Sequence, residues 1–356
     1  MMFALVLSNL AGGGAERAML RLAVALKRRG HGVRVIVLDP KIEHDVPPEL
    51  ELHTLHTRKG LLGAWLAARA LRGLYRRLGL GAECVTISTL PFADLVAARA
   101  NLANLWCRIT NTLSAEIREL QHASPSKAAR RLARYRRLYE GRNLVAVSDG
   151  VAVDLRAGIG LRRARIVRIY NGFDLDAIRG AAGQPEPDLP REPFVLHVGR
   201  FMPQKRHDLL LDAWQRTGLG HKLVLLAASS RELEALITQR GLQDRVLVAG
   251  FRPNPYPWMR AAELLVLSSD REGMPNVLVE ALACGTRVVS TDCPSGPREV
   301  MRGELARFLV PPGDAEALAA AMRAALAAPR PDERALPQDF AQARMVSAYE
   351  ALAMVQ

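Results

Sequence analysis

Two carboxylates in the second half of the chain have a spacing and a setting that suit sugar binding. Glu272 follows an apolar run of buried-strand length, 261–268, and Glu280 lies eight positions on, in an apolar-periodic segment for which Asn276 is a suitable N-cap. Carboxylate oxygens accept several hydrogen bonds in fixed orientations, which suits sugar hydroxyls. In a strand–loop–helix unit both side chains would reach the crevice at the carboxyl end of a sheet, where α/β folds bind ligands.

Two cations nearer the middle of the chain have the setting of a phosphate-binding site. Arg200 and Lys205 stand five positions apart, after a predicted strand over 194–198 and Gly199 and before a predicted helix over 207–216. An arginine can hold two phosphate oxygens at once, a lysine supplies a compact charge, and a helix start favours anions. Such fixed charges would stabilise a departing diphosphate.

A glycine-rich turn near the start is a third candidate. A predicted strand over 3–8 leads into three glycines that end with Gly13 and Gly14, and a helix to about residue 29 and a strand over 33–38 follow. Glycines let a backbone approach a ligand closely. The pattern is neither Gly-x-Gly-x-x-Gly nor a P-loop, and a tight turn also needs glycine, so a purely structural role stays open.

Composition limits the class of protein. The 356 residues are enough for two domains, and 49% hydrophobic residues is typical of a globular chain. Four cysteines without a metal-binding spacing predict a reduced, cytosolic protein. The first residues run directly into the glycine turn, so we interpret them as a strand and not as a signal peptide. Residues 60–75 are too short and too often interrupted by arginine to span a bilayer.

The formal net charge of +13 is concentrated in the first half of the chain. Residues 58–77 hold six basic and no acidic side chains, and residues 118–142 hold eight basic and two acidic ones, so each segment contributes +6. This asymmetry indicates an anionic partner such as membrane lipid, nucleic acid or a polyanionic substrate, with a solubilising surface as the alternative. The predicted helix over 61–78 combines Trp65 and Leu66 with arginines, which fits a core-facing helix or one in a membrane interface.

With its surroundings, the glutamate pair resembles the signature of the retaining GT-B glycosyltransferases of the GT4 type (glycosyl transferases group 1), in the branch common in envelope-polysaccharide synthesis. Glu272 begins Glu-Gly-Met-Pro-Asn, and Cys-Pro-Ser-Gly-Pro-Arg-Glu follows at 293–299. The resemblance is strong over 194–314, fair over 1–32 and 165–174, and weak between these ranges.

This resemblance implies an α/β fold of the GT-B type, with two Rossmann-like domains whose parallel sheets face each other across a cleft. We expect an N-terminal acceptor domain over 1–175 and a nucleotide-sugar-binding domain over 190–335. A C-terminal helix over 338–356 would cross back onto the first domain. Residues 181–193, rich in Gly, Pro and Glu, would form the linker.

The resemblance also implies roles for individual residues. Arg200 and Lys205 would hold the donor diphosphate in place of a metal ion, so neither a metal nor a cofactor is expected. Glu272 would orient the sugar hydroxyls and Glu280 would bind the ribose. Related enzymes often carry a His where this strand ends in Asn111, which makes Asn111 the candidate on the acceptor side. The residues with an implied catalytic role are Arg200, Lys205 and Glu272. Those implied in donor binding are Gly13, Gly14, Gly199, Arg200, Lys205, Phe251, Arg252, Glu272, Gly273, Met274, Pro275, Asn276, Val277 and Glu280.

The predicted reaction is the retaining transfer of a sugar from a nucleotide-diphosphate donor, a UDP-sugar in preference to a GDP-sugar. The acceptor would be a saccharide or lipid-linked saccharide in envelope polysaccharide or lipopolysaccharide synthesis. We expect a cytoplasmic enzyme that contacts anionic membrane at its inner face and binds no nucleic acid. A nucleotide-sugar hydrolase or epimerase of the same fold is the alternative. A basic nucleic-acid-binding protein is more remote, because aromatic residues make up only 5% of the chain and do not alternate with the basic ones.

Overall fold

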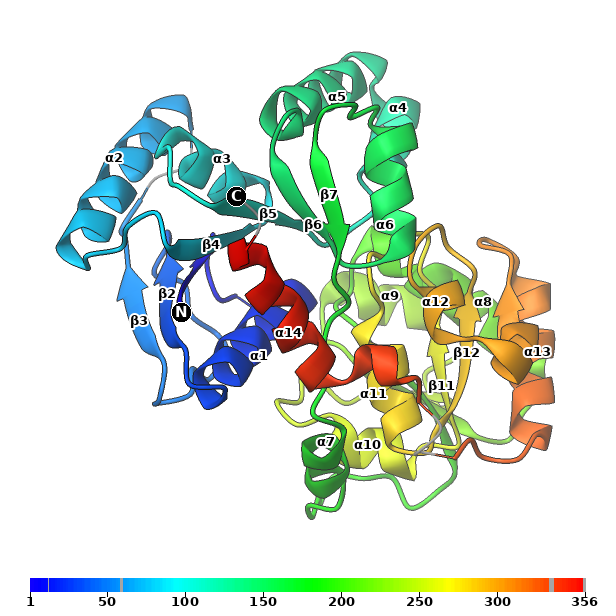
Figure 1. The fold of residues 1–356 in the computed structure, drawn as a ribbon. Coiled ribbons are helices and arrows are strands. Elements are labelled where there is room, and N and C mark those ends of the chain that lie inside the picture. The colour runs from blue at the N-terminus through cyan, green and yellow to red at the C-terminus, as the bar shows by residue number, and fades with distance from the viewer. Residues whose placement is uncertain (12, 58–59, 333–335, 355–356) are drawn as a thin grey trace. The chain divides into compact units, whose positions relative to one another are not determined.

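Two parallel sheets organise the chain, as the sequence predicted (Figure 1). The structure, a computed structural model, describes residues 1–11, 13–57, 60–332 and 336–354. Residues 1–173 with 338–356 form one compact unit, here called unit 1, and residues 174–337 form unit 2. None of the described helices is long and apolar enough to cross a membrane.

Unit 1 is built on seven parallel strands in the order β3-β2-β1-β4-β5-β6-β7. The strands are β1 (Met2–Leu7), β2 (Gly32–Val37), β3 (Glu51–Thr54), β4 (Cys84–Thr89), β5 (Leu105–Ile109), β6 (Asn143–Ala146) and β7 (Arg165–Arg168). The helices are α1 (Gly14–Arg28), α2 (Leu61–Arg77), α3 (Pro91–Arg99), α4 (Leu113–Ala123), α5 (Pro125–Tyr139), α6 (Asp149–Val153) and α14 (Gln342–Ala351).

Strand β1 shows why the first residues form a central strand. Phe3, Leu5 and Leu7 belong to the core cluster under α1 and α14, whereas Ala4 and Val6 belong to the cluster under α2 and α3 (Figure 1). Successive side chains of a strand point to opposite faces, and a parallel sheet is buried on both, so a continuous apolar run is what such a strand needs.

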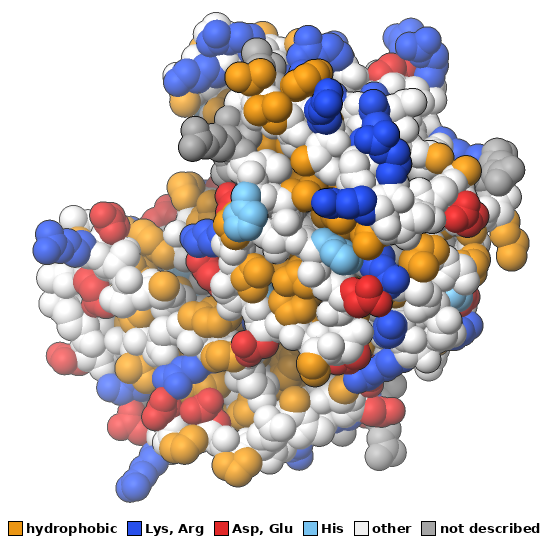
Figure 2. All heavy atoms as spheres, turned by 90° about the vertical axis from the view of Figure 1, so that its left-hand side faces the viewer, with side chains coloured by type: hydrophobic (Ala, Val, Ile, Leu, Met, Phe, Trp, Pro, Cys, Tyr) orange, Lys and Arg blue, Asp and Glu red, His pale blue; other side chains and the backbone are white. Residues whose placement is uncertain are grey.

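The sequence of helix α2 fits either a core-facing helix or one in a membrane interface, and the structure shows how its two faces are used. Its buried face, which includes Leu71 and Leu74, packs into the core, as in a surface helix of a globular protein. Leu62, Trp65 and Leu66 lie on the other side and are 71%, 55% and 52% exposed. Figure 2 faces this side of the molecule and shows hydrophobic and basic side chains gathered in its upper part, with few acidic ones. The helix therefore has a core face and also an exposed apolar face.

The last segment of the chain returns to unit 1 through a short backbone pairing. The Phe173 N–H donates to the Phe340 carbonyl (2.9 Å), and the Gln342 N–H donates to the Phe173 carbonyl (3.0 Å). A Cβ at Gly172 would lie 2.6 Å from the Met345 Cβ, so only glycine allows α14 to come this close. Helix α14 then packs against α1, with Tyr349 fully inside the core.

Unit 2 carries six parallel strands in the order β10-β9-β8-β11-β12-β13. The strands are β8 (Phe194–Val198), β9 (Lys222–Leu226), β10 (Val246–Val248), β11 (Leu264–Leu267), β12 (Arg287–Thr291) and β13 (Leu309–Val310). The helices are α7 (Leu175–Ala182), α8 (His207–Thr217), α9 (Arg231–Thr238), α10 (Tyr256–Ala261), α11 (Asn276–Ala283), α12 (Pro297–Val300) and α13 (Ala315–Ala327).

Several local expectations differ from the structure. The segment 181–193, interpreted as a linker, belongs to unit 2, where the Asn254 amide donates to the Ala181 carbonyl (3.1 Å). The apolar run 261–268 is shared between the end of α10 and β11, since buried Trp258 anchors a helix just before it. Helix α4 was not predicted. Asn276 is the first residue of α11 and Pro275 takes the N-cap position.

Candidate functional site

Residues predicted to bind phosphate and sugar lie on two loops of unit 2, at the point where the order of its strands reverses. The chain leaves β8 for β9 on one side, and β11 pairs with β8 on the other. In open α/β sheets the crevice at such a switch point binds ligands, at the carboxyl ends of the strands. The loop after β8 carries Gly199, Arg200 and Lys205, and the loop after β11 carries Glu272.

Lys205 and Glu272 are in direct contact. The Lys205 Nζ lies 2.6 Å from the Glu272 Oε1, and the Ser269 hydroxyl donates to the same oxygen (2.7 Å). The Glu272 side chain is 9% exposed and that of Lys205 22% exposed. Because a carboxylate this buried is costly without a charged or hydrogen-bonded partner, the ammonium and the hydroxyl together stabilise it and fix its orientation. The structure thus brings together two of the three residues predicted to be catalytic.

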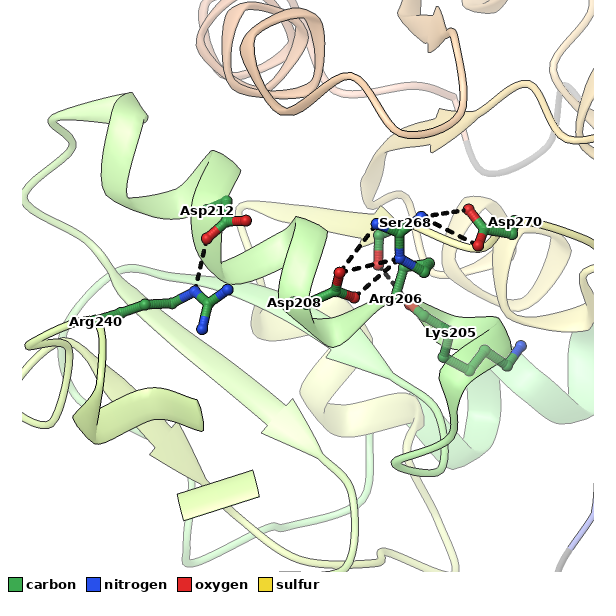
Figure 3. Close-up of polar contacts among 7 residues, drawn as sticks. All are labelled: Lys205, Arg206, Asp208, Asp212, Arg240, Ser268 and Asp270. Atoms are coloured by element: carbon green, nitrogen blue, oxygen red, sulfur yellow. Dashed lines mark hydrogen bonds and ion pairs between the residues drawn. The ribbon is translucent and has the colours of Figure 1, made fainter. Parts of the chain in front are cut away.

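The two loops are also tied through their backbones. The Ser268 hydroxyl donates to the Lys205 carbonyl (2.7 Å), as Figure 3 shows. The Gln204 amide donates to the Arg271 carbonyl (2.7 Å), and the Asp270 N–H donates to the Gln204 carbonyl (3.0 Å). Lys205 is therefore held at its backbone as well as at its ammonium group.

Arg206 binds two carboxylates, an arrangement here called the clamp, and the sequence did not predict this role. It has left-handed backbone angles, φ 49° and ψ 52°. Its guanidinium donates to both oxygens of Asp270 (2.9 and 3.1 Å) and to both oxygens of Asp208, so that it lies between two carboxylates (Figure 3). The hydrogen bonds to Asp208, with the charge of Asp270, raise the pKa of Arg206 further above its usual value. Asp270 is 64 positions away in sequence, so no local sequence pattern predicts its ion pair with Arg206.

Two buried histidines support the loop that holds Lys205. The His197 Nδ1 bonds the Val266 carbonyl (2.9 Å), and the His197 and His207 rings meet edge to face at 4.7 Å. Burial lowers the pKa of both rings, that of His207 to about 4, and the nearby charge of Lys205 lowers them further. Both rings are therefore neutral at pH 7. A Cβ at Gly199 would lie 3.3 Å from the His197 Nε2, so glycine fits this position best.

The rest of the glutamate motif lies in buried backbone. Residues 273–275 are buried, and Glu280 on α11 is 3% exposed. Gly296, in the loop after β12, has φ +93°, and a Cβ there would meet the Pro275 Cδ at 2.4 Å and the Gly273 carbonyl oxygen at 3.0 Å. The Pro-Ser-Gly-Pro sequence thus closes tightly over the turn that follows Glu272.

The remaining predicted donor residues of unit 2 differ in how they are held. Arg200 is exposed and, within the described part of the chain, forms no hydrogen bond or ion pair. Phe251 is 55% exposed. Arg252 is already engaged, because its Nη1 lies 2.6 Å from the Asp188 Oδ2 and its guanidinium lies over the Trp258 ring at 5.1 Å.

Gly13, Gly14 and Asn111 belong to unit 1, and Gly12 lies outside the described residues. A Cβ at Gly13 would lie 2.0 Å from the Glu16 Oε2, so this turn is covered by a carboxylate at the start of α1. The Asn111 Oδ1 accepts from the Thr112 N–H (2.9 Å). Within the described residues, no group of three or more His, Cys, Asp or Glu side chains is arranged to hold a metal ion.

Comparison with known proteins gives the family. A family model described as "Glycosyltransferase Family 4" matches residues 12–177, and one described as "Glycosyl transferases group 1" matches residues 192–328. The N-acetylgalactosamine-N,N'-diacetylbacillosaminyl-diphospho-undecaprenol 4-alpha-N-acetylgalactosaminyltransferase of Campylobacter jejuni is 31% identical over 303 residues, which cover 82% of this chain and 81% of that protein. The lipopolysaccharide 1,6-galactosyltransferase of Salmonella typhimurium is 29% identical over 48% of each chain.

A solved structure gives the fold independently. Anabaena HepE (Alr3699), in complex with UDP-glucose, superimposes with a TM-score of 0.76 over all of both chains at 22% identity. The likeness confirms the predicted α/β fold with its two parallel sheets. By its family matches and its Campylobacter relative, the chain belongs to the glycosyltransferases of group 1 and Family 4, the family that the motif around Glu272 resembled.

Proposed function

We propose that this glycosyltransferase moves a sugar from a UDP-sugar to a saccharide or lipid-linked saccharide during envelope polysaccharide or lipopolysaccharide synthesis, with retention of the anomeric configuration. The observation that carries the proposal is the contact between Lys205 and Glu272 at the switch point of unit 2. A cation for phosphate and a carboxylate for sugar hydroxyls stand side by side there, as a nucleotide-sugar requires.

The Lys205 and Arg200 side chains would stabilise the leaving diphosphate. The bond between the anomeric carbon and the phosphate oxygen breaks, and its electron pair stays with the diphosphate, where fixed cations lower the energy of the developing charge. The acceptor hydroxyl oxygen bonds to the same face of the sugar, and its proton passes to the departing phosphate oxygen. This route needs neither a protein base nor a metal ion, which is consistent with Asn111 where related enzymes often have His.

Glu272 would position the donor sugar. Lys205 and Ser269 hold its Oε1, so the orientation of the carboxylate is set before substrate arrives. Contacts that are in place before the substrate binds increase the rate of sugar transfer, because the reacting groups are already aligned. Glu280, buried on α11, is the candidate for the ribose.

The acceptor and the donor base rest on the relatives. The name of the Campylobacter protein gives it a diphospho-undecaprenol-linked acceptor, and that of the Salmonella protein gives it lipopolysaccharide. The Anabaena structure holds UDP-glucose. These names support a lipid-linked or lipopolysaccharide acceptor and a UDP-sugar donor. Contact with the inner face of an anionic membrane is proposed from the basic surface of unit 1.

The test begins with the donor. A thermal-shift panel of UDP, GDP and ADP should give a single clear response to UDP, since ligand at 100 times its Kd stabilises a protein by about 2.7 kcal/mol. The responding sugar derivative is then incubated with a lipid-linked acceptor, and the product is analysed by NMR. An α-linkage from an α-linked donor is expected, at a rate that a chelator leaves unchanged. Inversion would exclude the retaining mechanism.

The alternative enzyme class gives a different result in the same assay. A nucleotide-sugar hydrolase or epimerase would release nucleotide without forming a second glycosidic bond. Equal nucleotide release with and without acceptor would therefore favour that class.

A further inference from the structure

A hollow of about 830 Å³ lies between α3 and α5 of unit 1, away from the strand ends that carry the predicted glycine turn and Asn111. This volume is within the range of about 300–1,000 Å³ that ligand pockets occupy. Its lining combines two chemistries. The apolar side chains are Phe92, Leu95, Ala98 and Leu138, and the basic ones are Arg99, Arg134, Arg137 and Arg142.

A second hollow of about 510 Å³ adjoins the first, because Arg99 lines both. Arg72 on α2 joins the two helices here, since its guanidinium donates to the carbonyls of Ala100 (2.9 Å) and Arg99 (3.2 Å) at the end of α3. Trp65 lines this second hollow and is also part of the exposed apolar face of α2. The exposed face of α2, at Trp65, and the first pocket, at Arg99, thus border the same second hollow.

The arginines of α5 are used in two ways. Arg131 bonds Glu116, and the Arg136 Nε donates to the Ile159 carbonyl (2.7 Å), so these two hold unit 1 together. Arg134 and Arg137 are exposed at the pocket and, among the described residues, form no hydrogen bond or ion pair. Their positive charge is therefore available to a ligand.

No acidic side chain at the described lining offsets these charges. Asp94 of α3 points into the core instead, where it accepts from the Ser88 hydroxyl (2.6 Å) and the Tyr139 hydroxyl (2.8 Å). Burial raises the pKa of Asp94 to about 7, which further reduces its negative charge near neutrality. A ligand with an apolar part and an anionic head would match both chemistries of the pocket.

We propose that this pocket binds one anionic phospholipid from the membrane surface, with an acyl chain against Leu95 and Ala98 and the phosphate at Arg134 and Arg137. The inference deepens the membrane contact of the proposed function and rests on it. The phospholipid would then bind at a discrete site and not to a diffuse basic surface. The exposed apolar face of α2 would contact the adjoining lipid. The site differs from the one for donor nucleotide, which lies in unit 2.

The direct test uses the whole protein and a short-chain lipid below its micelle concentration. Titration calorimetry with dihexanoylphosphatidylglycerol should show one saturable site per chain. Dihexanoylphosphatidylcholine, which lacks net charge, and glycerol 3-phosphate, which lacks the chain, should each bind at least about tenfold more weakly. Equal binding of glycerol 3-phosphate would overturn the proposal in favour of a plain anion site.

A matched pair of variants separates the pocket from general surface charge. The double change Arg134→Ala with Arg137→Ala should weaken lipid binding about 25-fold. The control, Lys127→Ala with Arg130→Ala, removes the same charge from exposed positions of the same helix that do not line the pocket, and should stay within about twofold of the unaltered protein. An equal loss in both would show that only diffuse electrostatics is at work.

A third variant tests the apolar part. Ala98→Trp puts a large side chain at the pocket wall and should abolish binding of the short-chain lipid, whereas undiminished binding would contradict a chain in the pocket. The circular dichroism spectrum and Tm of the variant check that unit 1 still folds, and the UDP-induced thermal shift reports separately on unit 2. If UDP binds and lipid does not, the inference fails alone; if lipid binds and UDP does not, the proposed function is at fault.

Discussion

The loop around Glu272 in unit 2 and the face made by α2, α3 and α5 in unit 1 are both rich in basic side chains, but they use them differently. In the loop, Lys205 and Arg206 are each held by carboxylates, at 2.6 Å and 2.9 Å. On the face, Arg134 and Arg137 are exposed and line a pocket together with partly buried apolar side chains such as Leu95 and Ala98. Paired cations give fixed geometry, which chemistry needs, whereas unpaired ones suit a partner that brings its own negative charge.

The largest expected effect is at the paired cation and its carboxylate. Lys205→Ala or Glu272→Ala should lower the rate of sugar transfer about 100-fold or more, because either change removes a fixed charge from the site. Lys222→Ala, which removes a lysine bonded to the Asp244 carbonyl at the start of β9, is the control and should leave the rate unchanged. A near-normal rate in Lys205→Ala or Glu272→Ala would remove that residue from the site.

A smaller loss is expected at the clamp. Arg206→Ala should lower kcat about tenfold, because Lys205 loses the residue that fixes its neighbouring backbone. Arg240→Ala breaks another arginine–carboxylate pair of unit 2, with Asp212 at 2.6 Å, and should have little effect on the rate (Figure 3). Arg206→Gly tests the backbone, since glycine accepts left-handed angles. If Gly restores the rate that Ala loses, strain and not the missing clamp is responsible.

The loop and the basic face each contain a buried carboxylate, and the dependence of stability on pH can distinguish how the two are held. Glu272 is held by an ammonium, whereas Asp94, under the basic face, is held by two hydroxyls. Burial raises the pKa of Asp94 to about 7 in the folded protein, against about 3.9 when unfolded. Between these values the folded state binds the extra proton, so this group lowers the free energy of unfolding as pH rises from about 4 to 7, by up to about 4 kcal/mol.

Asp94→Asn removes that titration. The variant should gain in Tm relative to the unaltered protein as pH increases from 5 to 8, because only the unaltered protein must ionise a buried carboxyl. Thermal unfolding followed by circular dichroism at each pH measures the difference. A difference in Tm that does not change with pH would mean that Asp94 is already ionised at pH 5.

The smallest expected effect is on the exposed face of α2. Leu66→Ser should change stability by no more than about 0.5 kcal/mol, because Leu66 is largely exposed and contributes little to the core. It should weaken sedimentation with phosphatidylglycerol vesicles a few-fold, since one leucine less enters the lipid. Leu247→Ser, on β10 of unit 2 and 40% exposed, is the matched control. Equal binding by both variants would argue against α2 as a membrane contact.

Sequence reasoning reached the parts of the site that local spacing encodes. Lys205 and Glu272 each sit at a fixed offset from a strand end, and this offset together with the family motif was enough to assign both to the donor site, although their direct contact was not predicted. The role of Arg206 was not predicted because its partner Asp270 is far away in sequence. The role of His197 was not predicted because a histidine within an apolar strand is indistinguishable in sequence from an ordinary core residue. The burial of Asp94 likewise depends on Tyr139, 45 positions later, which only the folded chain brings near.

The return of the chain at Phe340 has a consequence for synthesis on the ribosome. Unit 2 is continuous in sequence and can fold once residue 337 has emerged, whereas unit 1 needs a helix that is made only after unit 2. Until then the slot on α1 that Tyr349 fills stays open to solvent, and a partly made chain exposes apolar surface that favours aggregation. A premature stop after residue 337 would therefore yield an intact second unit attached to an unfinished first one.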